Sequence, residues 1–271
     1  MELDGLKIAI VHDWLVNYAG ADRVVNQLHE LFPQAPIYTL VYDKKNMPHS
    51  FKTYDIRTTY LQKIPFATKL YKNMLAFMPG AFESLDLSEY DLVISSCSSC
   101  SKGIITRPET LHICYCNTPT RYLWDFYHIY LNNAGLLKRL LMPHIIKKMR
   151  LWDRLAADRV DYFIANSYNV RERISKYYRR ESKVIYPGVH ITSIPPVEKP
   201  DDYYLVVSRF TYYKRLDIAI QACNKLGKKL IVVGVGEEKK KLYSMAGPTI
   251  EFKGLLNDKM VRDLYRHAKA F

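Results

Sequence analysis

Two patterns of apolar residues alternate along the chain. The first apolar run, residues 6–12, is rich in β-branched side chains, and residues 21–31 then show apolar side chains at helical spacing. The same alternation continues over the first two thirds of the chain. The further strands predicted there are 37–42, 91–95, 111–116, 162–165 and 184–186, and the further helices are 66–78, a helix beginning at Pro143, and 170–178. Nearly continuous apolar strands that alternate with helices predict a parallel, doubly wound α/β sheet.

The pattern stops after residue 186 and then restarts. Pro187 and Gly188 are followed by prolines at 195, 196 and 200 among charged residues, a composition typical of an interdomain linker. Strands are predicted again at 203–207, 229–233 and 249–252, and helices at 216–226, 238–246 and 259–267. We therefore predict a first domain over 1–190, a linker over 191–202 and a second domain over 203–271.

The end of the chain resembles the start of one more strand at Ala270. Three and a half strand–helix units cannot cover both faces of a second sheet. We therefore expect the second domain to be incomplete and the natural protein to continue beyond Phe271.

Composition narrows the class of protein. The 271 residues are 48% hydrophobic, yet no stretch approaches the roughly 20 apolar residues that cross a bilayer, and the first five residues do not form a basic leader. We expect a globular protein of the cytoplasm. The net charge of +13 favours a partner that carries phosphate: a nucleic acid, an anionic lipid surface or a phosphorylated ligand.

The five cysteines do not suggest a disulfide framework, because their number is odd and the chain is long. Cys97 with Cys100 and Cys114 with Cys116 have spacings that zinc sites use. However, Cys114 and Cys116 fall on one face of a predicted strand, and the other pair lies in a serine-rich turn without glycine. Ordinary packed thiols are the favoured interpretation, and no metal site is predicted.

Residues 136–159 and 66–78 combine apolar residues with many cations. In the longer segment, Ile145, Met149, Trp152 and Ala156 form one apolar stripe. Such a helix can lie on an anionic membrane. Alternatively, its apolar stripe can pack against the protein core while its basic face is exposed to solvent. Both interpretations remain open at this stage.

Two junctions between a strand and a helix carry chemistry. The loop at residues 13–20 leads into a helix whose free N–H groups can bind an anion, and Gly20 would allow a ligand to approach closely. The loop at residues 208–215 carries Arg209 and Lys214, which could converge on one diphosphate. A plain turn and solvated surface cations are the alternatives, but ligands bind at strand ends in open α/β sheets.

Seven short motifs together resemble one family over essentially the whole chain. They are HDWL (12–15), AGADRVV (19–25), CYCNTPTRYLWD (114–125), ANS (165–167), IYPGV (185–189), SRFTYYKRLDIAI (208–220) and VVGVGEE (232–238). In order and spacing they resemble the GT4 group of retaining GT-B glycosyltransferases, and within it the mannosyltransferase-like enzymes of surface-polysaccharide (O-antigen) biosynthesis. The resemblance implies two Rossmann-like domains with parallel sheets that face each other across a cleft.

The resemblance also implies roles for particular residues. The donor diphosphate would be bound by Gly20, Arg209 and Lys214. The nucleoside side would be formed by Gly234, Gly236, Gly254 and Leu255, and the acceptor side by Asn117, Thr118, Arg121 and Asp125. No catalytic residue is assigned.

The chain departs from the family at several positions. Ala19 replaces a glycine that many relatives have, and His190 replaces an aspartate. Asn117 replaces a histidine, and a carboxamide cannot exchange a proton near neutral pH, so Asn117 is not interpreted as a general base. The paired glutamates of the family would lie beyond Phe271. We therefore expect the chain as given to bind the donor poorly and to turn over little.

The function expected from these features is transfer of a hexose, with mannose favoured, from a nucleotide sugar such as GDP-mannose. The acceptor would be a lipid-linked sugar or polysaccharide, configuration would be retained, and the protein would lie peripherally on the inner face of the plasma membrane. No cofactor or metal is expected, because no compact Asp-x-Asp site follows a strand. The alternatives are a non-catalytic carbohydrate-binding or lipid-binding relative and a basic nucleic-acid-binding protein. Nucleic acid is disfavoured because the cations form no recognised module.

Overall fold

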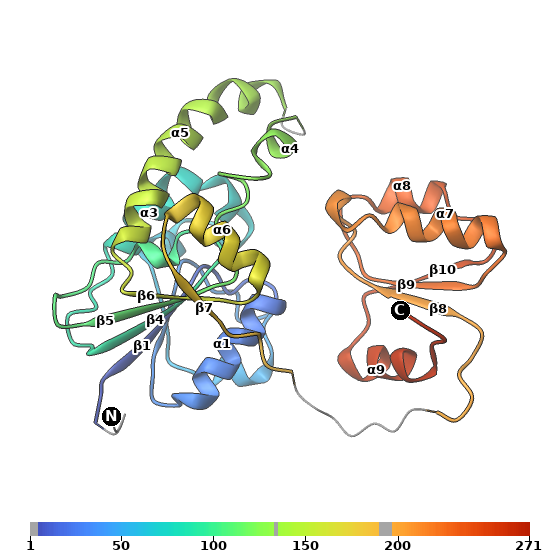
Figure 1. Cartoon of the computed structure of the whole chain (residues 1–271), viewed down its shortest axis with the longest axis horizontal. Coiled ribbons are helices and arrows are strands. Elements are labelled where there is room, and N and C mark those ends of the chain that lie inside the picture. The colour runs from blue at the N-terminus through green and yellow to red at the C-terminus, as the bar shows by residue number, and fades with distance from the viewer. Residues whose placement is uncertain (1–4, 133–134, 190–196) are drawn as a thin grey trace. The chain divides into compact units, whose positions relative to one another are not determined.

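The computed structural model describes residues 5–132, 135–189 and 197–271, which form two compact units, Met1–Val189 and His190–Phe271 (Figure 1). Each unit contains a parallel sheet with helices on its faces. His190 and the first half of the predicted linker lie outside the described residues. None of the described helices is both long enough and apolar enough to cross a membrane.

Unit 1 is built on a seven-stranded sheet in the order β3-β2-β1-β4-β5-β6-β7, and all its pairings are parallel. The strands are β1 (Ile8–His12), β2 (Ile37–Thr39), β3 (Ile56–Thr58), β4 (Leu92–Cys97), β5 (Leu111–Cys116), β6 (Tyr162–Ala165) and β7 (Ser182–Val184). The parallel α/β architecture is thus confirmed. The sequence analysis missed β3, because three residues with a central arginine carry no apolar run, and it placed β7 two residues too late.

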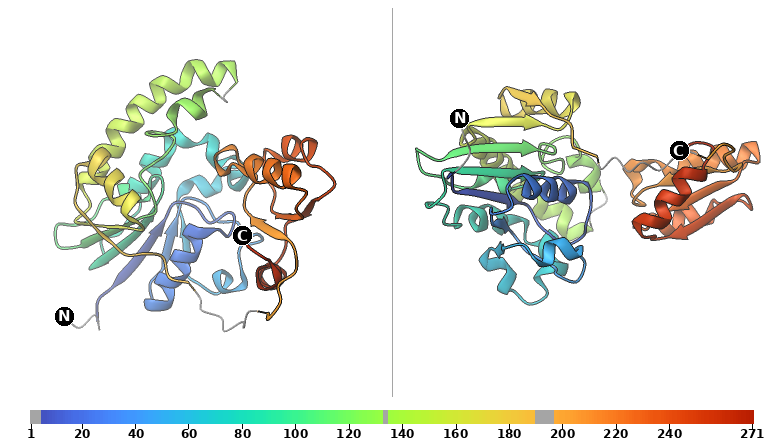
Figure 2. Two further views of the ribbon diagram at one scale, coloured as in Figure 1. Left: turned by 45° about the vertical axis from the view of Figure 1, so that its right-hand side comes forward. Right: turned by 90° about the horizontal axis from the view of Figure 1, so that it is seen from below.

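The helices of unit 1 cover both faces of this sheet (Figure 2). They are α1 (Gly20–Leu31), α2 (Ala67–Leu70), α3 (Met78–Glu83), α4 (Tyr127–Asn132), α5 (Leu136–Asp158) and α6 (Tyr168–Tyr178). Because side chains alternate along a strand, Ala9 and Val11 of β1 pack in the core beneath α3 and α5, whereas Ile10 packs with Val25 of α1.

Two helix predictions in unit 1 are wrong. Residues 66–78 form no single helix: the short α2 is followed by 3₁₀ turns at Tyr71–Asn73 and Leu75–Phe77 before α3 begins. This series of turns buries Ala67, Tyr71 and Met74 in the core. The long helix α5 begins seven residues before Pro143, which therefore lies inside it at the loss of one backbone hydrogen bond.

Unit 2 contains a three-stranded parallel sheet in the order β10-β9-β8. Its elements are β8 (Tyr204–Val207), α7 (Leu216–Leu226), β9 (Leu230–Val233), α8 (Lys239–Ser244), β10 (Ile250–Gly254) and α9 (Asp258–His267). The helices α7 and α8 pack on one face of the sheet, and α9 packs on the other.

The last residues of the chain add to this sheet on the free side of β8. Ala270 forms a parallel bridge with Tyr204, and the Leu205 N–H donates to the carbonyl of Ala270 at 2.9 Å. The expected start of a further strand is therefore confirmed. In both units the strand order reverses beside the first strand, which creates the topological switch point where open α/β sheets bind ligands.

Candidate functional site

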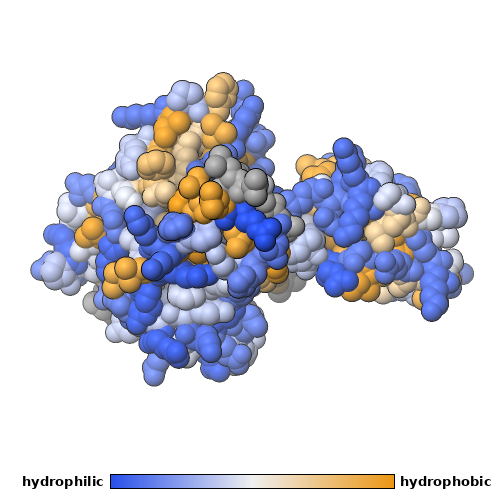
Figure 3. Space-filling model, turned by 90° about the horizontal axis from the view of Figure 1, so that it is seen from above, coloured by the Kyte–Doolittle hydropathy of each residue, from blue (hydrophilic) through white to orange (hydrophobic). Residues whose placement is uncertain are grey.

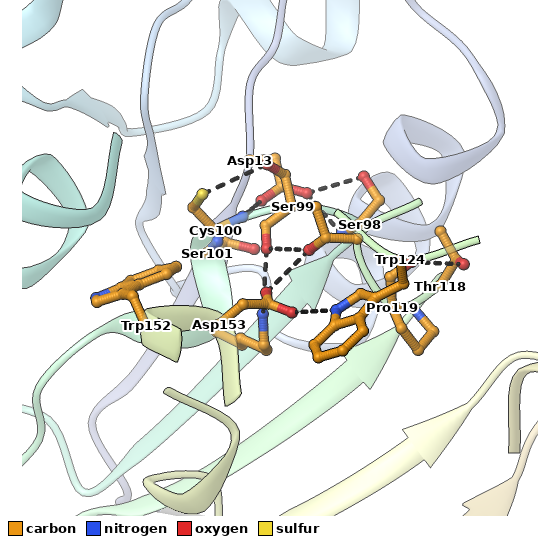
Figure 4. Close-up of polar contacts among 12 residues, drawn as sticks. Asp13, Ser98, Ser99, Cys100, Ser101, Thr118, Pro119, Trp124, Trp152 and Asp153 are labelled. Atoms are coloured by element: carbon orange, nitrogen blue, oxygen red, sulfur yellow. Dashed lines mark hydrogen bonds and ion pairs between the residues drawn. The ribbon is translucent and has the colours of Figure 1, made fainter. Parts of the chain in front are cut away.

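The switch point of unit 1 lies between the carboxyl ends of β1 and β4 and is filled by Asp13 (Figure 4). This buried carboxylate accepts hydrogen bonds from the backbone N–H groups of Ser98 (2.6 Å), Cys100 (2.9 Å) and Ser101 (2.9 Å), and from the Ser98 hydroxyl at 2.9 Å. The N–H groups that could hold a ligand phosphate here are thus already occupied by a carboxylate of the protein. The sequence analysis missed this contact, although an aspartate after β1 and a serine-rich turn after β4 were visible.

His12 links the end of β4 to the start of α1. Its buried ring has Nδ1 at 2.9 Å from the Ser96 carbonyl oxygen and Nε2 at 3.4 Å from the Asp22 carboxylate. Burial by itself lowers the pKa of His12, but the contact with Asp22 outweighs it, so the pKa is raised. The Asp22 carboxylate also accepts the Ala19 N–H at 2.8 Å. The contacts of His12 with Ser96 and Asp22 therefore hold the loop before α1 in place.

Gly20 is the first residue of α1 and is exposed. A Cβ built on it would have no neighbouring protein atom within 4 Å, so no packing contact in the chain requires glycine here. The assignment of Gly20 to donor phosphate remains a prediction.

The predicted acceptor-side residues lie in the loop after β5. The Asn117 side chain donates to the Ser96 hydroxyl at 3.0 Å, which ties the ends of β5 and β4 together. Arg173 of α6 donates to the Thr118 hydroxyl at 2.6 Å and forms an ion pair with Asp125. Thr118 and Asp125 are thus brought together by a residue that sequence analysis did not identify, since nothing in the pattern of α6 distinguishes Arg173 from its other cations.

Arg121, the fourth predicted acceptor-side residue, is partly exposed in the same loop. Its guanidinium lies over the ring of Phe126, 5.7 Å from the centroid. The four predicted residues therefore share one loop at the carboxyl edge of the sheet.

In unit 2 the loop after β8 carries the predicted diphosphate ligands Arg209 and Lys214, and both are exposed. Arg209 follows β8 by two residues, and Lys214 ends a 3₁₀ turn just before α7. Within the described part of the chain, neither side chain forms an ion pair, whereas the neighbouring Arg215 is paired with Asp217 at 3.0 Å. Two cations without a carboxylate partner thus lie beside the switch point of unit 2.

Two glycines after β9 allow this loop to pack closely. A Cβ on Gly234, whose φ is 138°, would lie 1.9 Å from the Ser208 carbonyl oxygen, and a Cβ on Gly236 would lie 2.4 Å from the Phe210 carbonyl oxygen. Glycine is therefore needed at both positions for contact between the two loops. Gly254, with a φ of 68°, ends β10 at the same edge, and the Leu255 side chain next to it is exposed.

The four cysteines of the short-spaced pairs are all buried in unit 1. Burial raises the pKa of the Cys97, Cys100 and Cys114 thiols, so they remain protonated. Across residues 5–132, 135–189 and 197–271, no cluster of three or more histidine, cysteine or acidic side chains is arranged to hold a metal ion.

Comparison with known proteins identifies the fold. No family model matches the chain, and no curated protein matches it. Among solved structures it is similar to sucrose-phosphate synthase from Thermosynechococcus elongatus, with 14% identity and a TM-score of 0.64 over 97% of this chain and 74% of that one. It is also similar to S. aureus TarM in complex with UDP, with 11% identity and a TM-score of 0.62 over 97% and 80% of the two chains. A third is Anabaena HepE in complex with UDP and glucose, with 14% identity and a TM-score of 0.60 over 97% and 72%.

These similarities confirm the predicted fold class. The chain has the GT-B fold, with two Rossmann-like α/β units that each contain a parallel sheet. At identities of 11–14% the similarity concerns the fold.

Proposed function

We propose that the protein is a glycosyltransferase that moves a hexose from a nucleotide sugar to a lipid-linked sugar or polysaccharide with retention of configuration. Mannose carried by GDP is the favoured donor, as in GT4 mannosyltransferases. The observation that carries the proposal is the pair Arg209 and Lys214, exposed and without ion-pair partners in the described chain, at the switch point of a GT-B unit. Support comes from HepE and TarM, whose structures contain UDP.

The contrast between the two units supports placing the diphosphate on unit 2. At the switch point of unit 1, three backbone N–H groups already donate to the Asp13 carboxylate, so these groups are not available to a phosphate. The corresponding loop of unit 2 carries Arg209 and Lys214 instead. The nucleoside would then lie beside Gly234, Gly236, Gly254 and Leu255, at the same edge of that sheet.

The proposed reaction depends on neutralising the leaving group. As the bond between the sugar and the diphosphate breaks, the guanidinium of Arg209 and the ammonium of Lys214 would stabilise the developing charge, assisted by the N-terminal N–H groups of α7. The acceptor hydroxyl would attack from the face that the diphosphate leaves, and its proton would pass to an oxygen of the departing diphosphate. Because two side-chain cations supply the counter-charge, the proposed reaction needs no metal ion or other cofactor.

Acceptor recognition is proposed for unit 1, in the loop after β5. Asn117 and Arg121 would contact the acceptor, while Thr118 and Asp125 engage Arg173. Gly20, at the start of α1, is proposed to face donor phosphate.

The diphosphate assignment can be tested by titrating GDP and UDP into the protein with calorimetry. Arg209→Ala and Lys214→Ala should each weaken binding at least tenfold, on the order of 1.4 kcal/mol, because each removes a charged phosphate contact. The matched control is Arg215→Asn, which removes a neighbouring arginine that already has Asp217 as its partner. Unchanged affinity in the Arg209 variant would refute the assignment.

Membrane contact is proposed for α5, but on a different face from the one that the sequence suggested. Met149 and Ala156 of the original stripe are buried and Trp152 packs against the core, whereas Ile145 is 36% exposed, so most of that stripe faces the core. On the opposite face Leu140, Leu151 and Leu155 are 70%, 65% and 56% exposed, and the exposed Lys147 and Lys148 lie between them. Figure 3 shows hydrophobic and hydrophilic side chains mixed on the surface above α5. Leucines with adjacent cations suit an anionic bilayer, and we propose a peripheral protein on the cytoplasmic leaflet.

Vesicle sedimentation tests this contact. The protein should bind vesicles of anionic phospholipid more tightly than neutral ones, and Leu151→Ser with Leu155→Ser should reduce binding severalfold because apolar area is lost. Leu226→Ser, at an equally exposed leucine of unit 2, is the matched control. If the protein binds random DNA and shows no preference for anionic over neutral vesicles, a nucleic-acid-binding protein is favoured instead.

A further inference from the structure

Lys102 and Asp153 form an ion pair that is completely buried in unit 1. Lys102 follows the turn that binds Asp13, and Asp153 lies on the core-facing side of α5 (Figure 4). Burial lowers the pKa of Lys102, but the attraction of Asp153 outweighs it and raises the pKa, so the ammonium stays charged. Its charge also lies 5.0 Å from the ring centroid of Tyr178 in α6.

The remaining hydrogen bonds of this pair are directed at two loops of the carboxyl edge. The Asp153 carboxylate accepts the Trp124 indole N–H at 2.8 Å and the Thr120 hydroxyl at 3.0 Å, both from the loop after β5. Lys102 donates to the Ser99 carbonyl at 3.2 Å in the loop after β4. The pair therefore joins α5 to the loop that carries the proposed acceptor residues.

A buried ion pair is not needed for stability alone, because a well-packed apolar pair of similar volume commonly serves as well or better. What an apolar pair cannot supply is a set of directed hydrogen bonds to Thr120, Trp124 and Ser99. Since both charges are inaccessible to water and to substrate, they cannot take part in the chemistry directly.

We propose that Lys102 and Asp153 are positioning residues, which hold the loop at residues 117–125 in the conformation that recognises the acceptor. That the ligand is a sugar acceptor rests on the proposed function. That the pair orders the loop does not depend on it. Asp153 holds Thr120 and Trp124 of the loop, while Arg173 holds Thr118 and Asp125.

The test compares the whole chain with the double variant Lys102→Met, Asp153→Leu. Amide hydrogen exchange in residues 117–125 should become at least tenfold faster, while exchange in α1, β1 and unit 2 stays unchanged. Binding of a mannoside acceptor probe should weaken at least tenfold, and GDP affinity should not change. The matched control is Arg154→Met, which removes an exposed ion pair with Asp158 on the same helix and should leave the loop unaffected.

A second pair of variants keeps both buried charges. These variants test the same proposal if the double variant does not fold. Trp124→Phe and Thr120→Val each delete one hydrogen bond from the side of the loop, and combined they should accelerate exchange in residues 117–125 in the same way. Unchanged exchange in that loop would overturn the proposal. If the loop loosens as expected but the unaltered protein binds no mannoside, then the positioning role stands and the acceptor assignment fails.

Discussion

Gly103 has room for a hydrogen atom and nothing larger. A Cβ built on it would lie 2.2 Å from Cζ2 of Trp152, an indole held in place by a hydrogen bond to Glu83 at 2.8 Å. This contact explains a glycine that no sequence motif singles out. At the residue scale, such requirements come from partners that are distant in the chain.

We expect Gly103→Ala to destabilise unit 1 by about 1–3 kcal/mol, because the methyl group must displace a packed ring. Urea unfolding followed by tryptophan fluorescence measures the change. Gly20→Ala, whose new methyl group would meet no protein atom, should alter stability far less. Equal stability of the two variants would show that Trp152 can move aside at little cost.

His112 is a completely buried histidine in β5. Its Nε2 is 2.8 Å from the Ser95 hydroxyl, and its Nδ1 has no hydrogen-bond partner among the described residues. Burial lowers its pKa from the usual 6.5 of histidine to about 4. The folded protein therefore keeps this ring neutral where the unfolded chain would protonate it.

The lower pKa of His112 in the folded state predicts that the protein loses stability in acid. Because the unfolded state binds the proton first, stability should fall as the pH drops from about 6.5 to about 4, by about 3 kcal/mol in total. In His112→Gln this part of the pH dependence should disappear from chemical unfolding curves, while the exposed-site variant His128→Gln should retain it. His12 cannot account for the effect, since its raised pKa makes its contribution complete at low pH and lost at high pH.

At the scale of elements, the end of α5 is held by Arg180, which follows the last residue of α6 by two positions. The Arg180 guanidinium donates to the carbonyls of Ala157 (2.9 Å), Asp158 (3.4 Å), Val160 (2.6 Å) and Asp161 (3.0 Å). Carbonyls at a helix end have no partner within the helix, so one cation satisfies several of them.

Arg180→Ala should therefore destabilise unit 1 by roughly 1.5–3 kcal/mol, the usual range for hydrogen bonds to a charged group. Thermal unfolding measures this, with Lys176→Ala, an exposed cation on α6, as the control. A loss no larger than that of the control would mean that water replaces the guanidinium at these carbonyls.

At the scale of the whole molecule, each unit has its own hydrophobic cores. The three tryptophans, Trp14, Trp124 and Trp152, all belong to unit 1. Tryptophan fluorescence thus reports the unfolding of unit 1, whereas circular dichroism reports both units.

Gly234→Ala should separate the two transitions. A methyl group against the Ser208 carbonyl, at a φ of 138°, should destabilise unit 2 by about 2 kcal/mol or more. The part of the circular dichroism signal that comes from unit 2 should be lost at a lower temperature. The midpoint of the fluorescence transition, which reports unit 1, should not change. A parallel shift of both would show that the two cores unfold as one.

The sequence by itself determined the alternation of strands and helices, the two α/β units and the strand ends at which Arg209, Lys214 and residues 117–125 lie. Hydrophobic periodicity is a local property and can be read within a window of a dozen residues. At residues 66–78 this periodicity predicted one helix, but the structure has a short helix followed by 3₁₀ turns. Periodicity also could not show which face of α5 is buried, because both faces carry apolar residues.

Only the tertiary structure decided which distant residues meet. Asp13 and Ser98 are 85 positions apart, and they bond because β1 and β4 are neighbours where the strand order reverses. The same holds for Arg173 with Thr118, and for Lys102 with Asp153, which are 55 and 51 positions apart. Such pairs depend on strand order and helix packing, and no local pattern of polar and apolar residues encodes them.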